Sequence, residues 1–362
     1  MRILIDIGHP AHVHLFKNFA HIMQNKGHKV LFTCREKEFE TDLLKANNFS
    51  FKSFGRKYNS ILGKLFGLAK FDFMEWKACL QFKPDILLSH GSMYAAHAAW
   101  AIRRPHISFD DTYNMEQVRL YEPFTPVILT GDYEHPRISK KEIKYAGYHE
   151  LSYLHPNYYT PDKSILEELG VKANEKYVVI RFIALNATHD WGNKGISPQR
   201  KIESVKTLSK YAKVFISAEG NLPKELEQFR LKTPPERIFD VMAFASLVWG
   251  ESITIPAEAA VLGVPAINNN DMTSYYLLDE QNNYGLCFCY KSNDDELNKA
   301  LEKCIELLKR DKKELFNEWG IKREKLLTDH IDVTAFLIWF IENYPESKRI
   351  MTENPDYQYQ FK

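Results

Sequence analysis

Short apolar runs alternate with longer amphipathic stretches along the first half of the chain. Largely apolar runs of four or five residues predict strands at 3–7, 30–33, 49–53, 85–89, 105–109 and 126–129. Stretches with helical periodicity lie among them, at 13–25, 38–47, 61–81 and 94–102. Such alternation predicts a parallel sheet whose strands are joined by crossover helices.

A similar cycle restarts in the second half. Five further runs predict strands at 177–184, 214–218, 246–249, 264–268 and 286–289, and amphipathic helices follow at 293–308, 312–327 and 333–344. Segment 150–162 has two prolines, three tyrosines and no period, which is typical of a linker. We therefore predict an α/β, GT-B-like fold: two Rossmann-like domains, 1–155 and 156–335, facing each other across a cleft. Residues 336–362 are predicted to be a C-terminal helix and a polar tail with little to bury.

Length and composition agree with this division and exclude some functions. A chain of 362 residues is long enough for two cores, and a net charge of +1 argues against nucleic acid as a partner. The five cysteines are widely spread and show no CxxC spacing, so we expect reduced core thiols. Cys287 and Cys289 alternate within a strand-like run, which leaves a metal pair there as the alternative.

Targeting features are absent from the beginning of the printed sequence. The chain starts directly with a predicted strand, and no window approaches the ~20 apolar residues of a membrane span. These observations predict a cytoplasmic protein. Segment 62–82 is rich in aromatic and basic residues, so it is either an amphipathic helix covering the sheet or a peripheral contact with the inner face of the membrane.

The stretch 250–265, GESITIPAEAAVLGVP, predicts a strand end, a polar turn and a short helix. Ser252 or Thr254 could cap this helix, and its first backbone N–H groups, around Ile253, could bind a diphosphate without a metal. Glu258, about one turn further on, could accept hydrogen bonds from ribose hydroxyls. The alternative is a helix buried in an α/β sheet, with Glu258 solvated at its edge.

Three histidines, His9, His12 and His14, follow the first predicted strand. A neutral imidazole at a helix start suits a general base, so we predict a base or substrate contacts there. A structural role and a metal site are the alternatives. His12 and His14 would point to different sides of a helix and no HExxH pattern accompanies them, so we expect no metal and no cofactor beyond the donor substrate.

Two more loops of the first half follow strands. His90 and Gly91 come after one strand and are predicted substrate contacts, since Gly91 permits close approach of the backbone. Asp110 and Asp111 come after the next strand, and one of them could contact an acceptor hydroxyl. Adjacent carboxylates in an extended segment diverge, which argues against a metal pair; an acidic pair that caps a turn is the alternative.

The second half offers further polar strand ends. The loop 185–195 could donate hydrogen bonds to phosphate from Thr188 and His189, and Arg181 lies within the preceding strand, where its charge needs a partner. Glu219 ends the next strand and is a predicted substrate contact. A solvated loop is the alternative for that carboxylate.

Residues 238–267, IFDVMAFASLVWGESITIPAEAAVLGVPAI, resemble the donor site of GT-B glycosyltransferases, especially the peptidoglycan GlcNAc transferase, and of the non-hydrolysing UDP-GlcNAc 2-epimerases. The resemblance implies that Phe239 flanks the uracil, that 252–254 hold the pyrophosphate and that Glu258 holds the ribose. The first loop, DIGHPAHVHLFKN, is similar to that of the same transferases, with His12 in the place of their loop histidine. PDILLSHGS and RPHISFDDT resemble the epimerases, and the likeness to an uncharacterised family of this superfamily covers about 1–290.

Some positions depart from these families. Pro10 and Ala11 replace the glycine run of the peptidoglycan enzyme, and Glu251 stands where many relatives have a small residue. Since a carboxylate repels a diphosphate, we expect Glu251 to turn away or to meet sugar hydroxyls. The full carboxylate set of the epimerases is not recognisable in this sequence.

The sequence therefore predicts a metal-independent glycosyltransferase of polysaccharide biosynthesis. It would transfer a sugar from a UDP-sugar to a cell-envelope glycan or lipid-linked precursor, with His12 as the base. The alternatives are a UDP-sugar 2-epimerase and a nucleotide-sugar-binding or assembly protein without turnover.

Overall fold

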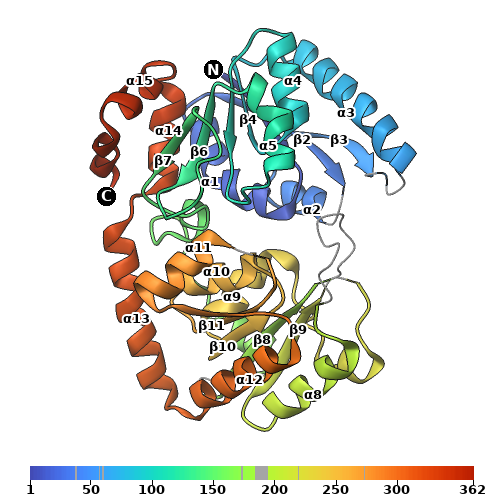
Figure 1. Cartoon of the computed structure of the whole chain (residues 1–362), viewed down its shortest axis with the longest axis vertical. Coiled ribbons are helices and arrows are strands. Elements are labelled where there is room, and N and C mark those ends of the chain that lie inside the picture. Colours follow the sequence, from blue (N-terminus) through green and yellow to red (C-terminus); the bar gives the residue numbers. More distant parts are fainter. Residues whose placement is uncertain are drawn as a thin grey trace. The chain divides into compact units, whose positions relative to one another are not determined.

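A computed structural model describes residues 1–36, 39–56, 58, 61–172, 174–183, 195–218, 220–272 and 274–362. These residues form two compact units, each built on its own sheet (Figure 1). Unit 1 contains Met1–Tyr158 and His330–Lys362, and unit 2 contains Tyr159–Asp329. The chain thus returns to unit 1 after leaving unit 2.

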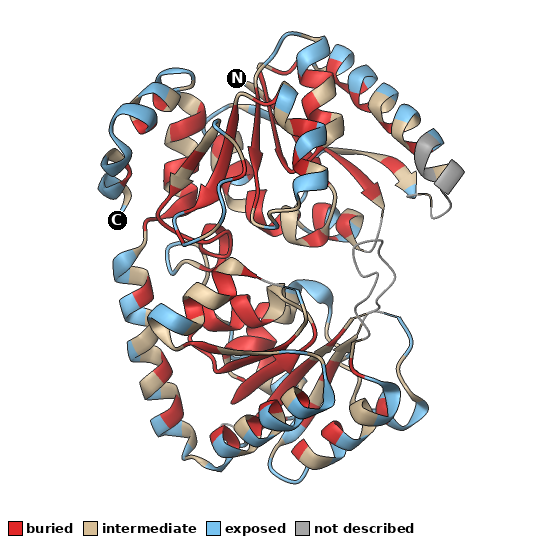
Figure 2. Cartoon of the chain, viewed as in Figure 1, coloured by how far each residue is buried: buried red, intermediate tan, exposed pale blue. Residues whose placement is uncertain are grey.

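Unit 1 is built on a seven-stranded sheet in the order β3-β2-β1-β4-β5-β6-β7, and all of its strand pairs are parallel. The strands are β1 (Arg2–Ile7), β2 (Lys29–Glu36), β3 (Phe51–Arg56), β4 (Ile86–His90), β5 (His106–Phe109), β6 (Val127–Gly131) and β7 (Glu142–Tyr145). The central strands are buried (Figure 2), which explains their almost continuous apolar sequence. The strand order reverses between β1 and β4, and ligands in open α/β sheets bind beyond the strand ends at such a point.

Helices connect these strands and cover the sheet. They are α1 (Pro10–Asn25), α2 (Glu40–Ala46), α3 (Ile61–Phe82), α4 (Met93–Ala101), α5 (Met115–Tyr121) and α6 (Leu151–Leu154). Near the C-terminus follow α14 (Val333–Glu342), α15 (Glu346–Glu353) and the 3-10 segment η6 (Pro355–Phe361).

The C-terminal segment is more buried than its polar sequence predicts. Met351 and Gln358 are buried, and the Gln358 side-chain oxygen accepts a hydrogen bond from the Ala146 N–H at 2.6 Å. The Trp339 ring of α14 lies 4.9 Å from the Tyr357 ring and 5.4 Å from the Phe361 ring. Aromatic contacts with α14 therefore hold this segment in place within unit 1. The sequence had instead predicted a tail with little to bury.

Unit 2 is built on a five-stranded parallel sheet in the order β12-β11-β10-β8-β9. Its strands are β8 (Tyr177–Phe182), β9 (Lys213–Ala218), β10 (Leu247–Gly250), β11 (Ala266–Asn269) and β12 (Cys287–Tyr290). Its helices are α7 (Ile165–Glu168), α8 (Pro198–Leu208), α9 (Ile238–Ala243), α10 (Thr254–Val261), α11 (Tyr275–Asp279), α12 (Asp294–Lys309) and α13 (Lys312–Asp329). The strand order reverses between β8 and β10. Two parallel sheets of the Rossmann type confirm the predicted fold class.

A buried ion pair ties the ends of β1 and β2 together. The Arg35 guanidinium donates to both carboxylate oxygens of Asp6, each at 2.8 Å, and both side chains are almost completely buried. The Ser92 hydroxyl, from the loop after β4, also donates to Asp6. Glu75 of α3 is buried nearby, and its burial together with the charge of Asp6 raises the pKa of its carboxyl well above the usual range. This network fixes the strand ends under the loops that carry the candidate site.

Candidate functional site

The loops after β1 and β4 meet where the strand order of unit 1 reverses. The Gly8 N–H donates to His12 Nδ1 at 3.2 Å, and the Ala11 N–H donates to His9 Nδ1 at the same distance, so His9 caps α1. The rings of His12 and His90 are stacked with their centroids 4.5 Å apart. Two predicted site residues from distant parts of the sequence are therefore in contact.

His14 does not join this group. Its ring is buried against Tyr153 of α6, with the centroids 5.5 Å apart. Burial, and then the positive charge of Lys17, lower the pKa of His14 well below its usual value. The side chain thus belongs to the packing of α1 in unit 1.

Gly91 gives the loop after β4 its shape. Its φ of +58° lies in the left-handed region, and a side chain there would also approach the Gln117 amide at 3.0 Å. The Gly91 N–H donates to Ser108 Oγ at 2.9 Å, and its carbonyl accepts from Gln117 Nε2 at 2.6 Å. These bonds hold the backbone that presents His90.

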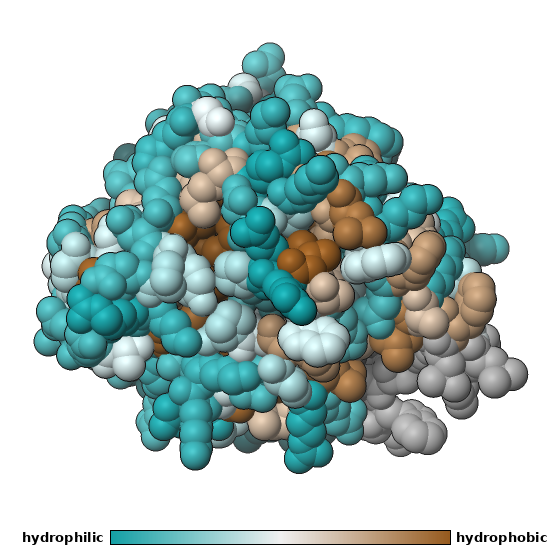
Figure 3. All heavy atoms as spheres, turned by 90° about the horizontal axis from the view of Figure 1, so that it is seen from above, coloured by the Kyte–Doolittle hydropathy of each residue, from teal (hydrophilic) through white to brown (hydrophobic). Residues whose placement is uncertain are grey.

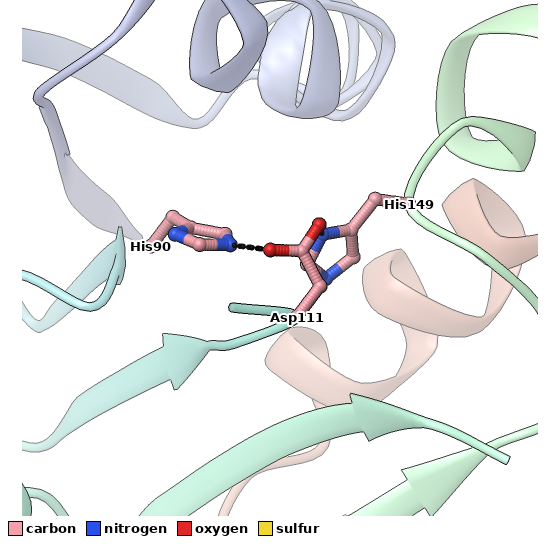
Figure 4. Close-up of side chains that lie close together, drawn as sticks. All are labelled: His90, Asp111 and His149. Carbon is pink, nitrogen blue, oxygen red and sulfur yellow. Dashed lines mark hydrogen bonds and ion pairs between the residues drawn. The ribbon is translucent and has the colours of Figure 1, made fainter. Parts of the chain in front are cut away.

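His90, Asp111 and His149 form a cluster at the ends of β4, β5 and β7 (Figure 4). His90 Nε2 lies 2.9 Å from Asp111 Oδ1, and His149 Nδ1 lies 2.9 Å from Asp111 Oδ2. Both histidines are buried, whereas the Asp111 side chain keeps 18% of its surface exposed. We call these three residues the histidine–aspartate cluster.

Asp111 and the two imidazoles of this cluster shift the pKa values of their neighbours toward the charged forms. Burial alone would raise the pKa of Asp111, but the neighbouring imidazoles of His149 and His90 outweigh it and hold this pKa well below the usual range. Burial opposes protonation of His90, yet Asp111 raises the pKa of that imidazole. The cluster therefore holds an ionised carboxylate between two imidazoles.

Asp110 points away from Asp111, as expected for adjacent residues. Its carboxylate accepts from the backbone N–H groups of Thr112 and Tyr113 at 3.0 and 2.9 Å and from the Tyr121 hydroxyl at 2.6 Å. It is buried, so these contacts stabilise the turn before α5. The structure brings Asp111, and not Asp110, to the histidines.

In unit 2, the start of α10 lies beside the point where the strand order reverses. Gly250 ends β10 opposite Arg181 of β8, and α10 begins four residues later at Thr254. Ile253 occupies the cap position and makes no side-chain capping bond; of the two predicted caps, Ser252 is the one whose hydroxyl accepts from an N–H of the first turn. Ser252 Oγ lies 3.5 Å from the Ile255 N–H, a long contact. Positions 252–254 are half-buried.

The other predicted donor-site residues are mostly buried in unit 2. Glu258 of α10 is buried, and so is Phe239 of α9, whose ring meets the Tyr159 ring edge-on at 6.1 Å. Arg181 is half-buried and donates to Ser217 Oγ at 2.8 Å, which supplies a polar partner within the sheet. The predicted residues Thr188, His189 and Glu219 lie outside the described residues.

Glu251 is turned into the interior of unit 2. Its carboxylate accepts from the Ile196 N–H at 2.6 Å and lies 2.8 Å from Lys201 Nζ. The side chain is buried and its charge is compensated by the lysine. Of the two expectations for this residue, the structure agrees with a side chain that turns away.

His149 is the member of the cluster that the sequence did not indicate. It follows the four-residue strand β7, which the apolar pattern did not predict. The sequence does contain one weak signal for this residue. His149 lies four residues after the segment EIKY, whose alternating pattern is typical of a strand. Without β7, His149 could not be assigned to the same sheet edge as His90.

Two Rossmann-type parallel sheets form a fold that this chain shares with solved UDP-GlcNAc 2-epimerases and GT-B glycosyltransferases. The chain belongs to the family described as a protein of unknown function (DUF354), which it matches over residues 1–316. An uncharacterized protein of Methanocaldococcus jannaschii is 23% identical over 278 residues, which is 74% of this chain and 81% of that protein.

Solved structures share the fold at low sequence identity. UDP-GlcNAc 2-epimerase from Neisseria meningitidis, bound to UDP-GlcNAc, aligns with a TM-score of 0.64 and 17% identity, covering 91% of this chain and 100% of that one. The glycosyltransferase SsfS6 from Streptomyces sp. SF2575 aligns with a TM-score of 0.58 and 11% identity, covering 95% of this chain and 100% of that one. These similarities establish the shared fold.

Proposed function

We propose that this protein transfers a sugar from a UDP-sugar to a cell-envelope glycan or its lipid-linked precursor. The observation that carries the proposal is the start of α10, beside the reversal of strand order in unit 2, with the buried carboxylate of Glu258 one turn later. A helix start offers backbone N–H donors and about half a positive charge, which suits a diphosphate without a metal. A buried carboxylate suits ribose hydroxyls, because both hydroxyls can donate to it.

The acceptor chemistry is proposed for the strand ends of unit 1. His12 is the proposed base, and Asp111 and His90 are the proposed contacts of the acceptor hydroxyl. The Gly8 N–H bonded to His12 Nδ1 favours the tautomer that carries its proton on Nε2. Proton acceptance by His12 therefore requires this loop contact to open when the acceptor binds. The electrostatic part of catalysis would come from the helix start at the leaving diphosphate.

Incubation of the purified protein with labelled UDP-GlcNAc and related UDP-sugars tests the proposal. UDP release that increases when a lipid-linked acceptor is added supports transfer. Binding of UDP-sugars without any product, across donors and acceptors, contradicts it and favours a binding or assembly protein.

Epimerisation is the second candidate, because acid–base groups lie at three strand ends of unit 1. His90, Asp111 and His149 are within hydrogen-bond distance of one another through the carboxylate. A UDP-sugar 2-epimerase needs such groups and no acceptor. Conversion of UDP-GlcNAc to an isomeric UDP-sugar in the absence of an acceptor would favour this candidate over transfer.

The ribose assignment predicts a specific effect of Glu258→Ala. We expect the affinity for UDP to fall by about 2 kcal/mol, roughly 30-fold, because hydrogen bonds to a charged group are lost. Calorimetry with UDP and 2′-deoxy-UDP measures this. The wild type should prefer UDP, and the variant should bind both equally. Glu258→Gln controls for the loss of volume, and an unchanged preference in Glu258→Ala would show that the ribose lies elsewhere.

A lipid-linked acceptor is supported by an aromatic surface on unit 1. Phe66, Phe73, Trp76 and Leu80 are exposed along one side of α3, and Trp100 of α4 is exposed beside them; we call these five residues the aromatic surface. Phe73, Trp76 and Trp100 line a hollow of about 390 Å³. Figure 3 shows hydrophobic patches among hydrophilic residues on the face seen from above. Exposed apolar patches of this kind mark interaction sites.

Basic residues accompany the aromatic surface. Lys77 is exposed on α3, and Lys83, Arg103 and Arg104 are exposed just beyond the ends of α3 and α4. Among the described residues, no helix is long and apolar enough to cross a bilayer. Aromatic side chains with flanking cations suit the interface of an anionic membrane, where each cation contributes about 1 kcal/mol. We propose that this surface holds the enzyme at the membrane that contains its acceptor.

The double variant Phe73→Ser and Trp100→Ser tests this contact. Both side chains are largely exposed, at 59% and 66%, so folding should be unaffected. We expect binding to vesicles of anionic phospholipid to weaken by about 2 kcal/mol, roughly 30-fold, because two bulky apolar groups no longer leave water. Co-sedimentation measures this. The control, Ile321→Ser on α13, removes a side chain that is 65% exposed and should bind like the wild type. Equal sedimentation of both variants would contradict the proposal.

A further inference from the structure

The histidine–aspartate cluster has the composition and spacing of a metal site. We propose that His90 Nε2, His149 Nδ1 and the Asp111 carboxylate together bind one divalent first-row transition-metal ion such as Zn²⁺. The proposal adds a cation to the proposed acceptor side, and metal binding itself does not depend on sugar transfer.

The distances between the three side chains agree with this proposal. Each ring nitrogen lies 2.9 Å from an Asp111 oxygen, and one ligand atom from each residue lies within 4.8 Å of the other two. Ligand atoms bonded tetrahedrally to Zn²⁺ at about 2.0–2.2 Å are about 3.3–3.6 Å apart. Small side-chain movements would therefore bring the three groups around one ion. Two imidazoles and one carboxylate suit Zn²⁺, Fe²⁺, Co²⁺ and Ni²⁺.

The backbone around the cluster is held in place before any ion binds. His90 ends β4, next to the Gly91 N–H that donates to Ser108 Oγ at 2.9 Å. The His149 carbonyl accepts from the Ser152 hydroxyl at 2.7 Å and from the Ser152 N–H at 3.0 Å. The imidazoles are buried, and Asp111 is partly exposed, so an ion could enter from the carboxylate side and keep a position open.

The charge of Asp111 also favours a cation. Among the described residues, the ion-pair partners of this carboxylate are His90 and His149, and no lysine or arginine is among them. The nearby strand-end cation, Arg35, is bonded through both of its terminal nitrogens to Asp6. The Asp111 side chain keeps only 18% of its surface exposed, and a divalent ion would place a permanent positive charge beside its carboxylate.

Two buried polar atoms next to the cluster have no hydrogen-bond partner among the described residues. When His149 donates to Asp111 from Nδ1, its Nε2 is an acceptor; this atom is buried and has no partner in the described part of the chain. The buried Tyr145 hydroxyl likewise has no partner there, and the two rings are stacked with centroids 6.2 Å apart. With a metal on His149 Nδ1, the ring proton would be on Nε2, which then becomes a hydrogen-bond donor. A tyrosine hydroxyl oxygen, such as that of Tyr145, can accept from such a donor.

If the proposed transfer reaction takes place, the ion has a role in it. A hydroxyl bound to the open position of a divalent ion loses its proton more readily. His12, whose ring is stacked on His90, would then receive that proton from a more acidic group. This consequence rests on the proposed function, whereas the binding of the ion does not.

Metal titration of the full chain tests the proposal without nucleotide or acceptor. Protein treated with a chelator and dialysed is titrated with Zn²⁺ and with Co²⁺ by calorimetry, and bound metal is measured by elemental analysis. We expect one equivalent per chain. Asp111→Asn and His149→Gln should each weaken metal binding by at least about tenfold. Mutating a residue that only orients a metal ligand already lowers metal affinity by about this factor, and removing the ligand itself should cost at least as much.

Two control variants separate this site from other candidate ligands. His97 and Asp72 form a half-buried pair at 3.0 Å on α4 and α3, so His97→Gln removes a similar pair with only two members. Cys289→Ser removes a thiol beside Cys287 on β12. Both variants should bind one equivalent like the wild type.

The outcomes distinguish this proposal from the proposed function. The metal site is overturned if the wild-type protein binds no more metal than Asp111→Asn. It is also overturned if metal binding is lost in Cys289→Ser but kept in Asp111→Asn. If the Asp111 variant does not fold, the visible spectrum of wild-type protein with Co²⁺ decides, since bound Co²⁺ in a nitrogen and oxygen site gives bands that differ from those of a thiolate site. Metal binding in a protein that turns over no UDP-sugar supports the site and contradicts only the proposed function.

Discussion

Replacing Arg35 with methionine is expected to lower the free energy of unfolding of unit 1 by about 3–5 kcal/mol. The substitution leaves the Asp6 carboxylate buried without its bidentate partner, and Glu75 is buried nearby. An uncompensated charge in the interior costs more than the ion pair contributes, because its hydration is not replaced. Denaturant unfolding followed by circular dichroism measures the change, and the loss should be visible as an earlier transition.

A second substitution and a surface pair serve as controls. The double variant Asp6→Asn and Arg35→Met should recover most of the stability, since it removes the buried charge together with its partner. Arg349→Met breaks an exposed pair with Glu346 and should change stability by less than about 1 kcal/mol. An Arg35→Met protein as stable as Arg349→Met would contradict the stabilising role of the buried Asp6–Arg35 pair.

The sheets could be predicted from the sequence because their central strands are buried on both faces. The runs at 3–7 and 85–89 are mostly apolar for this reason, and they correspond to β1 and β4 within one residue at each end. β7 was not predicted, because it is a four-residue edge strand in which half-buried and buried side chains alternate. A short alternating run of this kind is too weak a pattern to separate from a loop.

The candidate site could be predicted only in part, from the rule that ligands bind beyond the carboxyl ends of parallel strands. That rule brings His90 and Asp111 to one edge of the sheet, because β4 and β5 are parallel neighbours. It does not predict that Asp110 binds its own turn, which depends on the backbone N–H groups of Thr112 and Tyr113. It also does not place His149, because the edge strand before this residue was missed.

The end of the chain shows a limit of a different kind. Residues 346–362 are polar on average, and nothing in their local pattern indicates burial. Tyr357 and Phe361 are half-buried because their rings pack against Trp339 of α14, whereas Tyr359 stays exposed. Contacts between segments that are each weakly apolar depend on the tertiary fold, so no window of sequence predicts them.

Gly250→Ala is expected to destabilise unit 2 by about 3 kcal/mol or more. A Cβ at this position would lie 2.2 Å from the Arg181 carbonyl oxygen and 2.9 Å from the Arg181 nitrogen, and both atoms belong to the backbone of β8. A flexible side chain could move aside, but a paired strand cannot without losing hydrogen bonds such as that from the Glu251 N–H to the Arg181 carbonyl, at 3.0 Å. Thermal unfolding measures the loss.

The same substitution should weaken UDP binding, because β10 leads directly into the turn before α10. Separation of β8 from β10 would move the helix start that is proposed to hold the diphosphate, so calorimetry with UDP at a temperature where the variant is folded should show reduced affinity. Gly320→Ala is the matched control. Among the described residues, no atom outside the adjoining backbone of its own helix lies within 4 Å of the added Cβ, and alanine should stabilise the interior of α13 by about 0.5–1 kcal/mol. A Gly250→Ala protein that melts like the wild type would contradict the close approach of the two strands, and one that is destabilised but binds UDP unchanged would contradict the donor site at α10.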